Sequence, residues 1–140
     1  QQPGKYVHYF NTRTKQATPV ALDLKEPNGI TGTPDGKTLY VADIGAGKTY
    51  SYSILPDGGL GDKKLFCAMG SDGMTIDSQG NVYLTGKGVT VFDKTGVKLL
   101  EIPVPEPWTG NVTFAGRDRD LLFITAGKKV YGVKMTVKGA

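Results

Sequence analysis

Oxygen-bearing side chains occupy one recurring position of a repeated phrase in this chain of 140 residues. Asn28 stands in the phrase PNGI, Asp72 in SDGM and Asn111 in GNVT. Carboxylate and amide oxygens are the donors that hard cations such as Ca²⁺ and Mg²⁺ prefer in proteins. An oxygen-only site would form if the fold brought these positions to one axis. On spacing alone, the alternative is that Asn-Gly and Asp-Gly are hairpin corners, where these dipeptides are common.

The repeat has the period of a β-propeller blade. Each phrase opens a longer pattern, which reads PNGITGTPDGKTLYVAD from residue 27, SDGMTIDSQGNVYLTG from residue 71 and GNVTFAGRDRDLLFITAG from residue 110. The aligned polar residues are 44 positions apart (28 to 72) and then 39 apart (72 to 111). Because a period of about 40–45 residues is typical of four-stranded propeller blades, the sequence predicts an all-β fold built from such blades.

Short runs rich in Val, Tyr, Phe, Ile and Thr, bounded by Gly, Asn and Asp, predict the individual strands. These runs cover residues 5–10, 18–24, 29–33, 38–43, 49–54, 63–67, 73–77, 81–85, 89–93, 98–102, 111–115, 121–125 and 129–134. Turn glycines such as Gly36 and Gly80 stand where a tight hairpin demands a positive φ. We expect residues 1–24 to form the outer strands of one blade, 25–69 and 70–107 to form two blades, and 108–140 to form a last, incomplete blade.

Groups of two, four, four and three strands amount to about three blades, or half of a six-bladed β-propeller. Such an arc leaves unpaired strand edges at both ends, which favour association with other strands. We therefore expect either a complementary N-terminal half or a second copy of the chain, joined head to tail, to close the ring. The opening residues 1–4 (QQPG) read as the middle of a loop, which favours a fragment or a processed chain.

Composition excludes several classes of partner. The net charge of +4 is mild, and lysines are not interleaved with aromatic residues as a nucleic-acid groove requires. No apolar run approaches the roughly 18 residues of a membrane span, and no signal peptide opens the chain. We expect a soluble protein without nucleic-acid or membrane partners, and the compartment stays open because a single cysteine, Cys67, allows no internal disulfide.

Several ordered phrases resemble one known family. They are KEPNGI (25–30), TPDGKTLYVAD (33–43), SDGMTIDSQGNVYLT (71–85) and IPVPEPWTGNVTFAG (102–116). With their order and spacing, they resemble the C-terminal half of the gluconolactonase, senescence marker protein and luciferin-regenerating enzyme family, also known through regucalcin. The resemblance implies a six-bladed propeller with one divalent cation at its central channel, and hydrolysis of sugar lactones or related esters.

The resemblance also assigns residues to that site. It implies that Asn28 and Asp72 ligate the cation and that Asp72 is the general base. Ca²⁺ is the first expectation, with Zn²⁺ or Mg²⁺ as alternatives. The family's first-blade glutamate and a further asparagine ligand have no counterpart in this chain. That difference keeps open a non-catalytic propeller, acting as a binding or scaffold module, as the alternative function.

Three more residues are candidates for the substrate pocket. Asn111 fills the repeat position of Asn28 and Asp72, with a strand cap as the competing interpretation. Trp108 precedes the last predicted inner strand, where it would either wall the pocket or cover the ring face. Asp43 ends a predicted strand close to the ligand loops, and we expect it to accept hydrogen bonds in a structural rather than a catalytic role.

Overall fold

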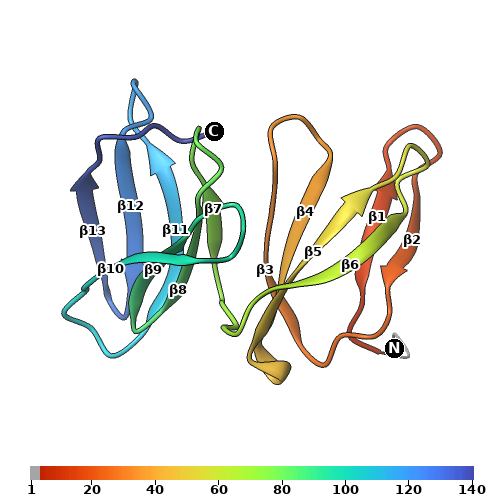
Figure 1. Ribbon diagram of the computed structural model, residues 1–140, viewed down its shortest axis with the longest axis horizontal. Coiled ribbons are helices and arrows are strands. Elements are labelled where there is room, and N and C mark those ends of the chain that lie inside the picture. Colours follow the sequence, from red (N-terminus) through yellow and green to blue (C-terminus); the bar gives the residue numbers. More distant parts are fainter. Residues whose placement is uncertain (1–3) are drawn as a thin grey trace.

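The computed structural model of the chain describes residues 4–140 and shows thirteen strands in four antiparallel sheets (Figure 1). The first sheet contains β1 (Val7–Asn11) and β2 (Gln16–Ala21). The second contains β3 (Pro27–Gly32), β4 (Thr38–Asp43), β5 (Lys48–Ile54) and β6 (Leu60–Cys67). The third contains β7 (Met74–Ile76), β8 (Val82–Gly86), β9 (Gly88–Phe92) and β10 (Lys98–Ile102), and the fourth β11 (Thr109–Ala115), β12 (Leu121–Ala126) and β13 (Lys129–Lys134).

Each strand pairs with its neighbour in sequence, so the sheets are meanders joined by tight turns. Gly36 and Gly80 adopt the predicted positive φ, at 69° and 85°, in the turns that follow β3 and β7. The predicted all-β class and the grouping into two, four, four and three strands are confirmed. Of the loop expected at residues 1–4, only Gly4 lies within the described residues.

Two local expectations were wrong. The second strand was expected to continue to residue 24, but β2 ends at Ala21 because the chain turns to bury Leu24 against the second sheet. A single turn of 3₁₀ helix, η1 (Ile44–Ala46), follows β4 where the sequence showed no helical signal. Three residues are too few for a helical period to be visible in the sequence.

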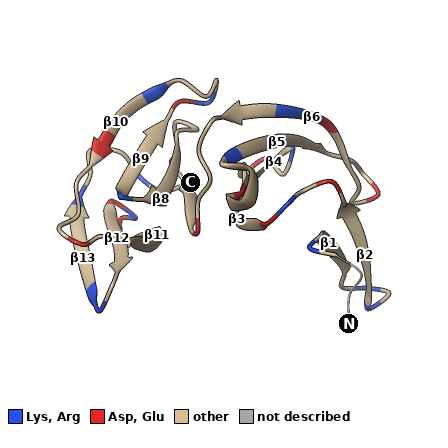
Figure 2. Cartoon of the chain, turned by 90° about the horizontal axis from the view of Figure 1, so that it is seen from below, with Lys and Arg blue, Asp and Glu red and all other residues tan. Residues whose placement is uncertain are grey.

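The four sheets follow one another along an arc, with their faces packed together (Figure 2). In that view β3 and β11 lie towards the inner side of the arc, and β6, β10 and β13 lie on its outer side. The first strands of successive sheets are neighbours, because β7 contacts both β3 and β11. The loops that introduce these three strands therefore come together.

The hydrophobic core lies between consecutive sheets, in three clusters. Strand alternation divides β8 between two of them, since Leu84 faces the second sheet and Tyr83 faces the fourth. Leu84, Leu122 and Ile124 are completely buried, and burial of such a side chain stabilises the fold by about 1.5–3 kcal/mol. No helix among the described residues has the length and apolar character to cross a membrane.

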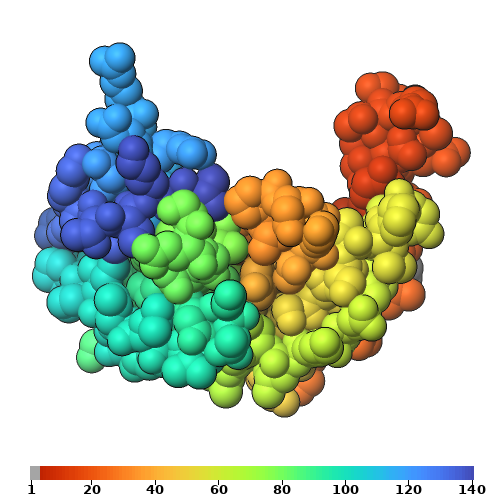
Figure 3. Space-filling view, turned by 45° about the horizontal axis from the view of Figure 1, so that its top comes forward, coloured from red at the N-terminus to blue at the C-terminus, as the bar shows by residue number. Residues whose placement is uncertain are grey.

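Both ends of the arc expose strand edges and apolar side chains. β1 and β13 each lie at the margin of their sheets, and the β1–β2 hairpin projects from the body of the molecule (Figure 3). Phe10 in β1 is 51% exposed and Val130 in β13 is 58% exposed. An uncovered edge of this kind is a template for pairing with another strand.

Candidate functional site

Asn28 lies at an irregularity in the ladder between β3 and β4. Pro27 pairs with Asp43 and Ile30 pairs with Val41, so three steps along β3 oppose two steps along β4. A bulge of this type leaves one residue without a ladder partner and redirects its side chain. Asn28 is consequently exposed at the start of β3, although the neighbouring Gly29 is buried.

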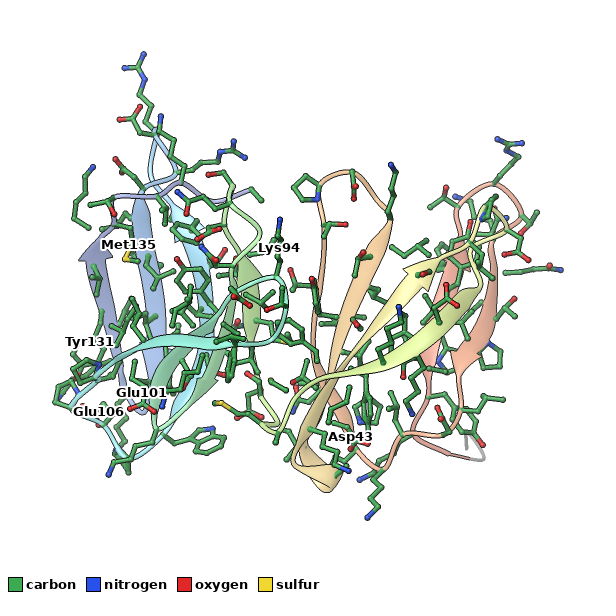
Figure 4. All side chains as sticks on the ribbon, viewed as in Figure 1. Asp43, Lys94, Glu101, Glu106, Tyr131 and Met135 are labelled. Carbon is green, nitrogen blue, oxygen red and sulfur yellow. The ribbon has the colours of Figure 1, made fainter. Side chains whose placement is uncertain are left out.

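Asp43 fixes the backbone that leads into β3. Its Oδ2 accepts from the backbone N–H of Lys25 at 2.9 Å, and its Oδ1 accepts from Glu26 at 2.8 Å and from Ala46 at 3.1 Å. Burial raises the pKa of Asp43, but these three N–H donors outweigh burial and hold the pKa below its ordinary value. Asp43 is 1% exposed and lies at the lower end of β4 in Figure 4. It accepts hydrogen bonds as expected, and its carboxylate faces backbone N–H groups.

Asp72 projects from a loop that is held by a buried hydroxyl network. The Ser71 hydroxyl accepts from the Thr85 backbone N–H at 2.7 Å and lies 2.7 Å from the Gly73 carbonyl oxygen. Gly73 N–H in turn donates to Thr85 Oγ1 at 2.9 Å. Because Ser71 and Thr85 are almost fully buried, this network fixes the backbone on both sides of Asp72.

The structure brings the two predicted ligands together from positions 44 residues apart. Asn28 Nδ2 donates to Asp72 Oδ1 at 2.9 Å, and the backbone N–H of Gly29 donates to the Ser71 carbonyl at 3.0 Å. The approach of β3 to β7 is close, since a Cβ on Gly29 would stand 2.7 Å from Met74 Cγ. Asn28 and Asp72 thus share one small surface formed by the starts of two sheets.

The start of the fourth sheet completes this surface. Trp108 Nε1 donates a hydrogen bond to Asp72 Oδ2, so both carboxylate oxygens of Asp72 have a partner. Asn111 lies against Gly73, where a Cβ would stand 2.6 Å from Asn111 Cα. Asn111 Oδ1 accepts from the Val112 backbone N–H at 2.8 Å, the local capping contact that competed with a pocket role.

The surface supplies few metal donors by itself. Within residues 4–140, no group of three or more His, Cys, Asp or Glu side chains could hold a metal ion. The donors present are the carboxylate of Asp72 and the amide oxygens of Asn28 and Asn111. These are oxygen donors suited to a hard cation, but Ca²⁺ takes six to eight ligands, so the residues fit one part of such a site.

Larger hollows lie away from these donors, and a smaller one lies beside Asn111. One of about 460 Å³ lies between the β1–β2 hairpin and the turn before β6, with Tyr9, Gln16 and Leu55 among its lining residues. The one beside Asn111 has about 170 Å³ and is also lined by Phe123 and Thr125. Asn28 and Asp72 line neither of these two hollows.

Sequence reasoning missed the residues that hold the site in place. Ser71 and Thr85 gave no signal of a buried network, because hydroxyl side chains are also common in exposed strands. Glu106 and Tyr131 were likewise not singled out, although Tyr131 donates to Glu106 Oε1 at 2.8 Å (Figure 4) and Glu106 lies in the loop that carries Trp108. The position of Ser71 inside the repeated phrase SDGM was the available clue.

Known proteins resemble this chain over most of its length. Residues 1–128 match the family model described as the SMP-30/gluconolactonase/LRE-like region. The lactonohydrolase oryL of Aspergillus oryzae is 30% identical over 159 residues, a match that covers 94% of this chain and 36% of that protein.

Solved structures share the fold. A gluconolactonase from Xanthomonas campestris is 28% identical with a TM-score of 0.85, and the match covers 100% of this chain and 46% of that one. Regucalcin from Agrobacterium tumefaciens, a calcium-binding protein, is 22% identical with a TM-score of 0.84, and the match covers 96% and 54%. The chain spans about a third to a half of the length of these relatives. It belongs to the SMP-30/gluconolactonase/LRE-like family.

Proposed function

We propose that this chain forms about half of a six-bladed β-propeller that hydrolyses a sugar lactone or a related ester with the help of a divalent cation. The observation that carries the proposal is the contact between Asn28 and Asp72, which joins two aligned repeat positions at the start of neighbouring sheets. The lactone-hydrolysing relatives support the substrate class. The four sheets correspond in this proposal to blades with boundaries at 1–24, 25–69, 70–107 and 108–140.

The open ends of the arc support completion by further strands. Relative to its four-stranded neighbours, the β1–β2 sheet lacks two strands and the β11–β13 sheet lacks one. Either a complementary N-terminal half or a second copy of the chain would cover these edges and the apolar side chains beside them. Native mass spectrometry of the purified chain with Ca²⁺ distinguishes a self-closing dimer from a monomer that needs a different partner.

Asn28 and Asp72 are the residues of this chain that would hold the cation. Ca²⁺ is the cation we propose for their oxygens, in keeping with the calcium-binding relative, and Mg²⁺ and Zn²⁺ are the alternatives. Asn28 directs its nitrogen at Asp72, so presenting its oxygen beside the carboxylate requires a half-turn of the amide group. When bound, such an ion polarises the lactone carbonyl and stabilises the negative charge that develops on its oxygen.

Asp72 is the group that we assign to proton transfer. Its carboxylate takes a proton from the attacking water as the new bond to the carbonyl carbon forms. It then returns the proton to the ring oxygen as the ester bond breaks, which yields the open hydroxy acid. Trp108 and Asn111 flank this carboxylate from the fourth sheet, where they would contact the substrate, whereas Asp43 acts from below by fixing the backbone before Asn28.

Asp72→Ala tests the assignment in the assembly that native mass spectrometry identifies as complete. We expect proton release from a panel of sugar lactones to depend on added Ca²⁺ and to disappear in the Asp72→Ala variant. The control is Asp118→Ala, which removes an exposed carboxylate in the turn before β12 and should leave hydrolysis unchanged. Hydrolysis that persists in Asp72→Ala would exclude this mechanism, and absence of turnover on the whole panel would favour the non-catalytic binding module.

A further inference from the structure

Trp108 holds the one carboxylate of the candidate site from the side opposite Asn28. The indole Nε1 donates to Asp72 Oδ2, while Asn28 Nδ2 donates to Asp72 Oδ1 at 2.9 Å. A carboxylate bound at one oxygen can still turn about its last side-chain bond. Donors on both oxygens remove that rotation and fix the plane of the group.

The segment that carries Trp108 is itself restrained. Prolines at positions 103, 105 and 107 fix φ at three places just before the tryptophan. Between them Glu106 accepts from Tyr131 and pairs with Lys129 Nζ at 2.8 Å, which anchors the loop to β13. Lys129 and Tyr131 also hold the pKa of Glu106 below its ordinary value, so this anchor is ionised at neutral pH.

The residue after Trp108 is fixed as well. Thr109 is completely buried at the first position of β11, where it pairs with Ala126. The indole is 50% exposed between this buried threonine and the anchored Glu106. Because the residues before and after Trp108 are fixed, its backbone has little freedom to move. Its indole N–H can therefore hold a hydrogen bond in one direction although the side chain is half exposed.

We propose that Trp108 is a positioning residue, which orients Asp72 through its indole N–H so that Oδ1 faces Asn28 and the cation that both residues would hold. This inference rests on the proposed role of Asp72 but concerns a contact that exists without any ligand. It assigns different tasks to the two oxygens: Oδ2 belongs to the indole, and Oδ1 is directed at the place where Asn28 would also present an oxygen. A side chain that only covered the ring face would not hold Asp72 in this way.

Nuclear magnetic resonance of the labelled chain tests the contact without a cation or a substrate. Trp108 is the only tryptophan, so the spectrum contains a single indole N–H signal. We expect Asp72→Ala to move that signal and to speed its exchange with solvent. We also expect Trp108→Phe, which keeps an aromatic ring but removes the donor, to shift and broaden the side-chain NH₂ signals of Asn28 across the carboxylate.

Phe10→Leu is the matched control, since Phe10 is 51% exposed and lies in β1, outside this site. It should leave both the indole signal and the Asn28 signals in place. Asn28 signals that are unchanged in Trp108→Phe would overturn the proposal, because the carboxylate would then keep its orientation without the indole. An indole signal that ignores Asp72→Ala would overturn it as well.

Kinetics in the completed assembly separate this inference from the proposed hydrolase function. Loss of a hydrogen bond to a charged group should lower kcat of Trp108→Phe about tenfold, with KM changed less than about twofold. If lactones are hydrolysed and Trp108→Phe retains full kcat, the positioning role is wrong while the role of Asp72 stands. If no lactone is hydrolysed, the proposed function fails, and the resonance experiment still decides whether Trp108 orients Asp72.

Discussion

Gly73→Ala should force apart the two strand starts that form the candidate site. A Cβ at this position would stand 2.6 Å from Asn111 Cα, whereas ordinary van der Waals contact begins at 3.4 Å. The Asn111 side chain, whose Oδ1 is the nearest atom, could turn away, but Asn111 Cα belongs to the backbone of the neighbouring β11 and could not. Relief therefore requires β7 and β11 to separate, which also loosens the loop that carries Asp72.

Two opposing effects determine how much folding stability Gly73→Ala should lose. Overpacking of a close contact costs about 1–3 kcal/mol, and a backbone obstacle places this site at the upper end. A stiffer unfolded chain returns about 0.4–1 kcal/mol of stability for any Gly→Ala change that the native backbone tolerates. The net loss for Gly73→Ala is then about 2 kcal/mol, out of roughly 5–15 kcal/mol for a typical domain.

Gly110→Ala provides the comparison within the same pair of strands. A Cβ on Gly110 would meet its nearest neighbour, Thr125, at 3.9 Å, so only the stabilising effect on the unfolded chain remains. The two variants should differ by about 3 kcal/mol, which corresponds to about 6–12 °C in Tm for a chain of this size. Thermal unfolding followed by circular dichroism measures the difference. Equal Tm values for the two variants would refute the close approach of β7 and β11.

Two further predictions concern stability. Leu84→Ala empties a completely buried position between the second and third sheets and should lower the free energy of unfolding, measured in urea, by about 2–5 kcal/mol. Leu99→Ala is the control, because Leu99 is 52% exposed and its loss should lower that free energy by less than about 0.5 kcal/mol. Similar losses in the two variants would show that Leu84 does not lie in the core. Because the folded-state pKa of Asp43 is depressed, its carboxylate stabilises the fold above the unfolded pKa and loses that effect as pH falls through the folded value. The stability advantage of the wild type over Asp43→Asn, measured at a series of pH values, should therefore shrink below about pH 4, and an advantage that stays constant down to pH 2 would contradict the three backbone contacts.

Local signals were sufficient for the strands of this fold. The strands Thr38–Asp43, Lys98–Ile102 and Lys129–Lys134 have the limits that the sequence predicts, and a turn glycine precedes each run closely. The end of β2 was misjudged because it depends on a contact outside the run. Leu22 and Leu24 continue the apolar pattern, but whether the chain keeps pairing or turns to bury Leu24 depends on the next sheet.

The candidate site was predictable only in part. The repeat alignment selected Asn28 and Asp72, and the structure places them in contact. The contact of Asp72 with Trp108 depends on how the proline-containing loop crosses from β10 to β11, and no spacing rule encodes that path. The network of Ser71 and Thr85 was invisible for a related reason, since a hydroxyl in a strand can face solvent or backbone and only the packed sheets decide which.

Because polar residues of the repeat lie at or next to register shifts, the metal donors of a blade can change without changing the strand pairing that stabilises it. Asn28 lies inside the irregular stretch of β3 and has no ladder partner, and Asn111 is the first residue to pair, with Thr125, after the register shift of β11. Residues one or two steps farther along, such as Ile30 and Val112, return to regular pairing with the next strand. A single substitution at the bulge can add or remove an oxygen donor while pairing and core alternation stay intact. In a duplicated module, ligand sets can therefore diverge without passing through an unstable sheet.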